Sequence, residues 1–250
     1  LTSSTVSGLH SNYSNFTYDT NGLGNLKSKT GVGTYTYGSP NNNCAIKTAG
    51  PHAVTQVSGG SMQPAASYCY DKNGSMISGS NRSISYTPFD KPEVINRNCQ
   101  SVSFTYGPNR SRIQKSDQTG TTIYVRGIYE KNESGNTTKH KYYVGNYAVV
   151  NVEDNTASTR YLHRDHLGSV DAITDESGTV QERQSFDAWG KRRHSDWQSP
   201  LDLYTYQSST TNRGFTNHEQ LDAVGLIHMN GRAYDPILGR FVSADPFVQD

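Results

Sequence analysis

The chain has 250 residues and a formal net charge of +1, so its overall electrostatics favour neither an acidic nor a basic partner. Hydrophobic residues make up only 32% of it, yet it holds 17 tyrosines and 23 glycines, whereas a disordered chain is poor in aromatic residues. This composition predicts an all-β structure that is thin and rich in turns. Because the first residue is Leu1 rather than methionine, we expect the chain to be a piece of a longer polypeptide.

One compact basic run lies at Lys191-Arg192-Arg193-His194. An interface with nucleic acid needs a patch of such residues, and no second cluster accompanies this one. We therefore expect a solvated turn here and no nucleic-acid partner. No apolar stretch approaches the roughly 18 residues that a membrane-spanning helix requires, so we expect no membrane span.

The three cysteines are Cys44, Cys69 and Cys99, at spacings of 25 and 30 residues. An odd number at these spacings matches neither a disulfide framework nor a Cys-x-x-Cys metal pair. We therefore expect buried or incidental thiols, with no metal and no cofactor.

A short phrase returns along the chain, in which an aromatic residue precedes an aspartate and a turn that contains asparagine or glycine. The clear copies begin at Tyr18 and Tyr70, and weaker copies begin at Phe89, Tyr106, Phe186 and Tyr234. The copies at residues 70, 89 and 106 are 19 and 17 residues apart. A period of about 20 residues predicts a repeat array in which each unit stacks on its neighbours.

Each copy of the phrase predicts a β-hairpin. The aromatic residue ends a strand, the aspartate accepts hydrogen bonds from backbone N–H groups two residues on, and Asn-Gly supplies the positive φ of a tight turn. Alternation of apolar and polar residues supports strands at 83–86 and 102–106. Helical periodicity is nearly absent, and it predicts at most two turns of helix, from Asn217 to Val224.

The triplet His163-Arg164-Asp165 matches the catalytic loop of protein kinases. The chain nevertheless lacks the glycine-rich loop, strand lysine and Asp-Phe-Gly element that a kinase requires. His163 and His166, with Asp165, also suggest a metal cluster. On a strand, residues 163 and 165 share a face and 166 points away, so the histidines converge only if a turn intervenes. Polar residues on a β-surface explain the triplet better.

The densest pattern covers Gly225 to Asp250, where the steps Asp235-Pro236 and Asp245-Pro246 lie ten residues apart around Gly239-Arg240. Proline disfavours the helical region for the residue before it, so we expect each aspartate in an extended backbone with its carboxylate at a turn. The pattern predicts strand, turn, strand and turn.

These phrases resemble the RHS or YD repeats of bacterial polymorphic toxins, of Tc insecticidal toxin B and C components and, more distantly, of teneurins. The resemblance is continuous from about Tyr70. Its most specific carriers are YLHRDHLGSV from Tyr161, SFDAWGKRR from Ser185 and GFTNHEQLDAVGLIHMNGRAYDP from Gly214. It implies stacked antiparallel β-hairpins that form a curved ribbon, part of an RHS cocoon-like shell whose thin wall has solvent on both faces. It also implies YD repeats at residues 1–160 and an RHS repeat-associated core at 161–250, truncated before a second Asp-Pro-x-Gly element.

The function that the resemblance implies is structural: a shell segment of a bacterial toxin that encapsulates a C-terminal effector for delivery. The implied partners are the rest of the shell, its toxin domain and a secretion or injection apparatus such as type VI secretion. The implied location is secreted or delivered from a bacterial cell. Exposed edge strands would need cover from the rest of the polypeptide or a partner. A glycan-binding or adhesive array is an alternative, although tyrosines that pack along strands explain the same residues.

The enzymatic alternative is a self-cleaving aspartyl protease element that releases the toxin. The resemblance places one catalytic aspartate at Asp245, with Asp235 and Arg240 as supporting candidates. Carboxylate proteolysis needs two acids that share a proton, and the chain ends before the family's second element. Asp245-Pro246-Phe247-Val248 also lacks the glycine of the family's Asp-Pro-x-Gly. We expect at most half of a protease here, and a plain turn role for Asp245 stays open.

Overall fold

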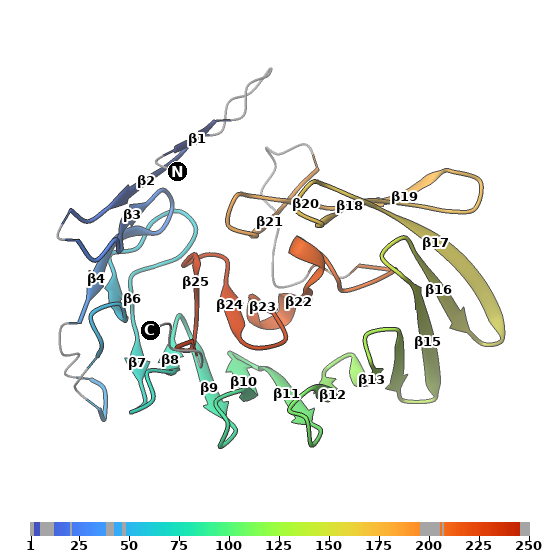
Figure 1. Ribbon diagram of the computed structural model, residues 1–250, viewed down its shortest axis with the longest axis horizontal. Coiled ribbons are helices and arrows are strands. Elements are labelled where there is room, and N and C mark those ends of the chain that lie inside the picture. The colour runs from blue at the N-terminus through green and yellow to red at the C-terminus, as the bar shows by residue number, and fades with distance from the viewer. Residues whose placement is uncertain are drawn as a thin grey trace.

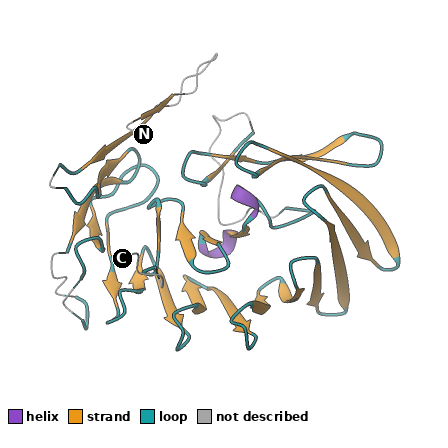
Figure 2. Cartoon of the chain, in the orientation of Figure 1, coloured by secondary structure: helices purple, strands orange, loops and turns teal. Residues whose placement is uncertain are grey.

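The computed structural model describes residues 3–5, 13–20, 22–38, 43–46, 49–195, 206 and 208–245. These residues form antiparallel strands joined by tight turns (Figure 2), which confirms the all-β prediction. The helical structure described consists of two 3-10 turns, η1 (Phe215–Asn217) and η2 (Asp222–Val224), on either side of strand β22 (Glu219–Leu221). The predicted helix from Asn217 to Val224 is therefore wrong, because pairing with the next strand extends its centre. No described helix is long and apolar enough to cross a membrane.

Two sheets follow one another along a curved ribbon (Figure 1). The six-stranded sheet contains β1 (Ser3–Thr5), β2 (Tyr13–Tyr18), β3 (Leu26–Lys29), β4 (Gly33–Tyr37), β5 (Val54–Val57) and β6 (Ala66–Ser67). The 13-stranded sheet contains β7 (Cys69–Tyr70), β8 (Met76–Gly79), β9 (Arg82–Tyr86), β10 (Pro92–Arg97), β11 (Gln100–Tyr106), β12 (Arg112–Asp117), β13 (Gly120–Val125), β14 (Tyr129–Ser134), β15 (Thr137–Val144), β16 (Ala148–Glu153), β17 (Thr156–Arg164), β18 (Val170–Thr174) and β19 (Val180–Arg183). Strands that are neighbours in the sequence are neighbours in each sheet, as in a chain of hairpins. The 13-stranded sheet continues through residue 160, and the division of the chain there stays a prediction.

The ribbon is followed by a hairpin and a small sheet. The hairpin pairs β20 (Ser185–Phe186) with β21 (Arg192–Arg193). The small sheet, called the terminal sheet below, contains β22, β23 (Leu226–His228), β24 (Ala233–Asp235) and β25 (Arg240–Phe241). Figure 1 shows the terminal sheet enclosed by the curve of the ribbon.

The turns have the hydrogen bonds that the repeated phrase predicts. Oδ1 of Asp71 accepts from the N–H groups of Asn73 and Ser75, each at 2.9 Å. The same arrangement recurs at Asp165, Asp175 and Asp187. The glycine three residues after each aspartate has a φ between +80° and +85°, a conformation that side chains disfavour. The aspartate of the His-Arg-Asp triplet is therefore a turn residue.

Alanine substitutions at two of these glycines distinguish the cost of a strained backbone from the cost of overpacking. A Cβ at Gly190 would lie 2.6 Å from Cδ1 of Phe215, whereas a Cβ at Gly178 would meet nothing within 4 Å. We expect Gly178→Ala to lower the free energy of unfolding by about 1 kcal/mol, through its positive φ alone. We expect Gly190→Ala to lower it by about 3 kcal/mol, because overpacking adds to the strain. Urea unfolding of the two variants tests this, and equal losses would contradict it.

One hydrophobic core lies between the ribbon and the terminal sheet. Its ribbon side includes Tyr68, Met76 and Ile95, and its terminal-sheet side includes Leu226 and Leu238. The inner face of this part of the ribbon is thus covered, so the expectation of solvent on both faces is wrong here. The low hydrophobic content suffices because two β-layers share this core, beside which the described residues hold a smaller cluster of Tyr143, Val149, Leu162, Val170 and Ile173.

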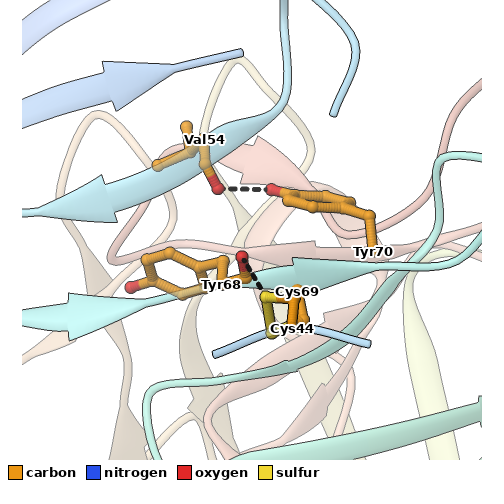
Figure 3. The surroundings of a disulfide bond; sticks show 5 residues. All are labelled: Cys44, Val54, Tyr68, Cys69 and Tyr70. Atoms are coloured by element: carbon orange, nitrogen blue, oxygen red, sulfur yellow. Dashed lines mark hydrogen bonds between the residues drawn. A yellow bond between two sulfur atoms is a disulfide. The ribbon is translucent and has the colours of Figure 1, made fainter. Parts of the chain in front are cut away.

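Cys44 and Cys69 form a disulfide (Figure 3), with their Cα atoms 5.4 Å apart, and Cys99 is free and exposed. The expectation of three thiols is therefore wrong. The spacing did not indicate the bond because the loop after β4 folds back onto β7, a contact that no local pattern encodes. Next to the disulfide, the hydroxyl of Tyr70 donates to the carbonyl of Val54 at 2.8 Å.

Reduction of this disulfide is expected to lower the free energy of unfolding by about 3 kcal/mol, because the bond closes a loop of 25 residues and restricts the unfolded chain. Urea unfolding with and without a phosphine reductant measures the loss. A Cys44→Ser/Cys69→Ser variant should match the reduced protein, while Cys99→Ser should respond to reductant as the natural chain does. Insensitivity of the natural chain to reductant would contradict the prediction.

The basic run at residues 191–194 is not a solvated turn. Arg192 lies in β21 with 3% of its surface exposed, and its Nε donates to Asp222 at 2.9 Å. Its guanidinium also lies over the rings of Tyr206 and Phe186, 4.3 and 5.2 Å from their centroids. Arg192 thus connects the hairpin to the terminal sheet. A run of basic residues in the sequence does not reveal that one of them is buried.

Candidate functional site

Asp235, a predicted site residue, ends β24 and is completely buried. Its Oδ1 accepts from the N–H groups of Ile237 and Leu238, each at 2.9 Å. Its Oδ2 forms a salt bridge with Arg82 of β9, whose guanidinium also donates to the carbonyl of Val224 at 3.1 Å. The aspartate lies at a turn as predicted, and both of its oxygens have structural partners.

The same turn is also held by side chains of the six-stranded sheet. Nζ of Lys29 donates to the carbonyls of Pro236 and Ile237, at 2.9 and 2.7 Å. The hydroxyl of Tyr35 donates to the carbonyl of Leu238 at 3.0 Å. Burial lowers the pKa of Lys29 to about 8, against the opposing effect of Asp187 and Asp235. We call Arg82, Lys29 and Tyr35, with the turn from Asp235 to Leu238, the Asp235 clamp.

Arg240 lies opposite Asp235 in the pairing of β24 with β25, but its side chain has other partners. Its guanidinium donates to the carbonyl of His52 and lies over the ring of Tyr37, 5.5 Å from the centroid. Arg240 thus connects the terminal sheet to the six-stranded sheet.

Asp245 is more open, with 52% of its side chain exposed, and it pairs with Arg232 at 2.9 Å. The guanidinium of Arg232 lies over the ring of Phe241, 3.8 Å from the centroid. The predicted Asp-Pro step continues at Pro246 and beyond, outside the described residues. The three predicted residues therefore have separate partners: Asp235 with Arg82, Arg240 with His52, and Asp245 with Arg232.

A second buried polar cluster surrounds Glu219 of β22. Its carboxylate pairs with Arg112 and, at 3.0 Å, with Lys115, and it accepts from the hydroxyl of Tyr124 at 3.0 Å. Burial alone raises the pKa of Glu219, but Arg112 and Lys115 outweigh that effect and hold the pKa well below its usual value. Among the described residues, no group of three histidine, cysteine, aspartate or glutamate side chains could hold a metal ion.

Sequence reasoning missed every ribbon residue of these clusters, because Arg82 is 153 positions from Asp235 and Lys29 is 207 positions from Pro236. The available signal was the occurrence of arginine and lysine at inward-facing strand positions, where apolar residues are expected. Chemically, the clusters contain paired charges and backbone acceptors, an arrangement suited to holding two layers together. The site is an internal anchor.

A ribbon of antiparallel hairpins with repeated Asp turns, curved around an anchored terminal sheet, defines the chain as a β-shell of the YD-repeat class. The family model of the teneurin YD-shell matches residues 6–250. The chain belongs to the teneurin YD-shell family, which confirms the resemblance drawn from its repeats.

The curated relatives are toxins and nucleases. The chain is 23% identical to the tRNA nuclease WapA of Bacillus subtilis strain 168 over 189 residues, which are 72% of this chain and 8% of WapA. It is 28% identical to the double-stranded DNA deaminase toxin A of Burkholderia cenocepacia strain H111 over 109 residues, which are 39% of this chain and 6% of that protein. The chain thus spans less than a tenth of the length of these relatives.

The fold is also that of solved Tc toxin components. A crystal structure of TcdB2-TccC3 superposes with a TM-score of 0.61 at 15% identity, and it covers 94% of this chain and 14% of the other. The Photorhabdus luminescens Tc holotoxin pore gives a TM-score of 0.58 at 15% identity, with the same coverage.

Proposed function

We propose that this chain is a wall segment of an RHS-type shell that encloses the C-terminal effector of a bacterial toxin. The observation that carries the proposal is the Asp235 clamp. It anchors the terminal sheet to the inner face of the ribbon, so that the polypeptide after this sheet begins from a point fixed to the wall. The toxin among the relatives supports the same function.

The partners that follow from this proposal are the rest of the shell, the effector and a delivery apparatus, with a location outside the producing cell or in a target. Among the described strands, β1 pairs with β2 only, and β19 pairs with β18 only. Unpaired strand edges are sites of further pairing, which the remaining shell would supply.

Limited proteolysis of the parent protein, expressed with its natural sequence beyond Asp250, tests the proposal. We expect that sequence to resist trypsin in the intact parent, because the wall excludes the protease. An Asp235→Asn parent should lose the protection, because the anchor is broken. A Glu133→Gln parent, altered at an exposed ion pair with Lys131, should keep it. Digestion of the downstream sequence at the rate of the isolated effector would refute enclosure.

We also propose self-cleavage as a second function, with Asp245 as a catalytic carboxylate and Asp235 and Arg240 as residues that position the terminal sheet. The half-exposed side chain of Asp245 supports this assignment, since a carboxylate that acts on a peptide bond must be reachable. Mass spectrometry of the parent and its Asp245→Asn variant distinguishes the outcomes. Two fragments from the parent and an intact variant support the proposal, and equal cleavage of both refutes it. Asp175→Asn, at an exposed turn, is the matched control.

A further inference from the structure

A cleft of about 790 Å³ lies where two turns of the ribbon meet the chain of the terminal sheet. Its ribbon side includes the turn between β11 and β12, at residues 107–111, and the turn between β13 and β14, at Arg126 and Gly127. Its other side includes residues 216–219 and the turn between β23 and β24, at Asn230 and Gly231. Neither the Asp235 clamp nor the proposed self-cleavage uses this cleft.

Basic side chains outnumber acidic ones in the lining of the cleft. The lysine and arginines of the lining are Lys91, Arg110, Arg112, Arg126 and Arg213. Its carboxylates are Glu130, which pairs with Arg213 at 3.1 Å, and Glu219, which pairs with Arg112. Each acid is thus matched by a cation within the protein, and the positive charges of Lys91, Arg110 and Arg126 are left over.

Lys91 and Arg110 lie together on one side of the cleft. Nζ of Lys91 donates to the carbonyl of Arg110 at 2.6 Å and to that of Asn230 at 3.3 Å, which leaves its third N–H for a ligand. The guanidinium of Arg110 lies over the ring of Phe89, 5.5 Å from the centroid, and the residue is exposed. Burial lowers the pKa of Lys91, and the charge of Arg110 lowers it further. The surroundings of the amine are therefore positive.

Arg126 extends the positive charge to the next turn along the same edge of the sheet. It is exposed, and Nη2 of Arg213 donates to the carbonyl of the adjacent Gly127 at 2.8 Å. The aspartate beside Lys91 in the sequence, Asp90, accepts instead from an asparagine of the preceding turn at 2.8 Å. Among the described residues, no carboxylate forms an ion pair with any of the three left-over cations.

The spread of these charges favours a ligand with several acidic groups. The turns that carry Arg110 and Arg126 are two strands apart in the sheet, a spacing of roughly 10 Å, which exceeds the size of one small anion. Single-stranded nucleic acid would have the charges, but its bases also bind by stacking on aromatic rings. The phenylalanine, tyrosine or tryptophan ring in the described lining is that of Tyr124, and the guanidinium of Arg112 covers it at 4.2 Å from the centroid. An acidic polypeptide needs no such ring.

The terminal sheet brings the following polypeptide close to this cleft. Asn230 and Gly231 line the cleft, and the next residue, Arg232, pairs with Asp245 at 2.9 Å. Asp245 is the last residue that the structure describes. A segment that follows it in the parent protein is therefore a nearby source of acidic side chains.

We propose that this cleft binds an acidic segment of the polypeptide that follows the terminal sheet, whose carboxylates pair with Lys91, Arg110 and Arg126. The inference rests on the proposed shell function, because it takes the occupant from the chain that the shell encloses. Such a contact holds the beginning of the enclosed polypeptide against the wall, next to the anchor that the Asp235 clamp provides.

Binding of fluorescein-labelled hexaglutamate to the 250-residue chain, followed by fluorescence anisotropy, tests the cleft. We expect saturable binding that weakens as the NaCl concentration rises. Arg110→Gln/Arg126→Gln should raise the Kd about tenfold, because each exposed ion pair contributes modestly. Lys27→Gln/Arg183→Gln removes the same charge at exposed positions outside the cleft and should leave the Kd unchanged. Absence of saturable binding, or an equal change of Kd in both double variants, refutes the site.

A labelled single-stranded DNA hexamer distinguishes a polypeptide site from a general polyanion site. We expect it to bind more weakly than hexaglutamate, because the cleft offers its bases no open tyrosine, phenylalanine or tryptophan ring among the described residues. DNA that binds as tightly as hexaglutamate and loses as much affinity in Arg110→Gln/Arg126→Gln refutes the assignment to polypeptide.

The parent protein, expressed with its natural sequence beyond Asp250, tests the source of the segment. Hexaglutamate should bind the parent roughly tenfold or more weakly than the 250-residue chain, because the tethered segment competes at a high effective concentration. A parent whose downstream aspartates and glutamates are replaced by their amides should recover the binding, which separates occupation of the cleft from steric exclusion. Equal binding to the parent and to the 250-residue chain refutes the proposal.

Trypsin resistance of the parent reports enclosure separately. A parent that resists trypsin but binds hexaglutamate as the 250-residue chain does keeps the shell function and refutes the acidic contact. A parent that excludes hexaglutamate through its own acidic residues but is digested freely keeps the contact and refutes enclosure.

Discussion

Replacement of Asp235 by asparagine is expected to lower the free energy of unfolding by about 3–5 kcal/mol. The substitution keeps the shape of the side chain and an oxygen for the N–H groups of Ile237 and Leu238. It removes the charge that compensates Arg82, whose side chain is 2% exposed, and it places an NH₂ group against the guanidinium. The buried arginine is then uncompensated, which is the costly state for a broken internal ion pair.

A double-mutant cycle shows whether this loss belongs to the pair. Arg82→Met and Asp235→Asn should each be strongly destabilising in urea, and the double variant should lose much less than their sum, because no unpaired charge remains. Glu133→Gln, at the exposed pair with Lys131, is the control and should change stability little. Additive losses around the cycle would show that Arg82 and Asp235 act independently and that the clamp is misassigned.

The hairpins could be predicted because their signals are local. An aspartate, two further residues and a glycine carry the whole turn, since Oδ1 of Asp187 binds Trp189 and Lys191 within four residues. The extended Asp-Pro step at Asp235 could be predicted for the same reason. The partner of Asp235 across the core could not be predicted, because the pairing with Arg82 depends on how far the ribbon has curved before it meets the terminal sheet.

For the tyrosines, the packing of the rings could be predicted from the sequence, but the hydrogen-bond partners of the hydroxyls could not. Their rings were expected to pack along strands, and Tyr35, Tyr70 and Tyr86 do lie against the shared core. Their hydroxyls donate to backbone carbonyls, which are those of Leu238, Val54 and Met76 respectively. Burial raises the pKa of all three hydroxyls, which keeps them protonated as donors. Tyrosine therefore combines apolar area with cross-layer hydrogen bonds, which compensates for the scarcity of aliphatic side chains.

The lowered pKa of Glu219 leads us to expect that acid weakens the attachment of the terminal sheet to the ribbon. Its pKa in the folded chain is held below the ordinary 4.5, so its contribution to stability is present above pH 4.5 and is lost as the pH falls toward the folded pKa. Within that window the contribution shrinks by about 1.4 kcal/mol per pH unit. His228 acts in the same direction at higher pH, because burial holds its pKa well below 6.5 and the unfolded chain takes up the proton first.

Substitution of Glu219 by glutamine isolates the carboxylate from the histidine. At pH 7 the variant should be about 3–5 kcal/mol less stable, because Arg112 and Lys115 lose a buried counter-charge. The difference in the free energy of unfolding between the natural chain and the variant should shrink as the pH falls below 4.5, since the natural carboxylate then protonates on unfolding. Because Glu219 also raises the pKa of His228, both proteins are compared in a His228→Gln background, which removes the histidine from this difference. Urea unfolding from pH 3 to pH 7 measures the difference, and a gap that does not change with pH would mean that Glu219 does not carry the charge assigned to it.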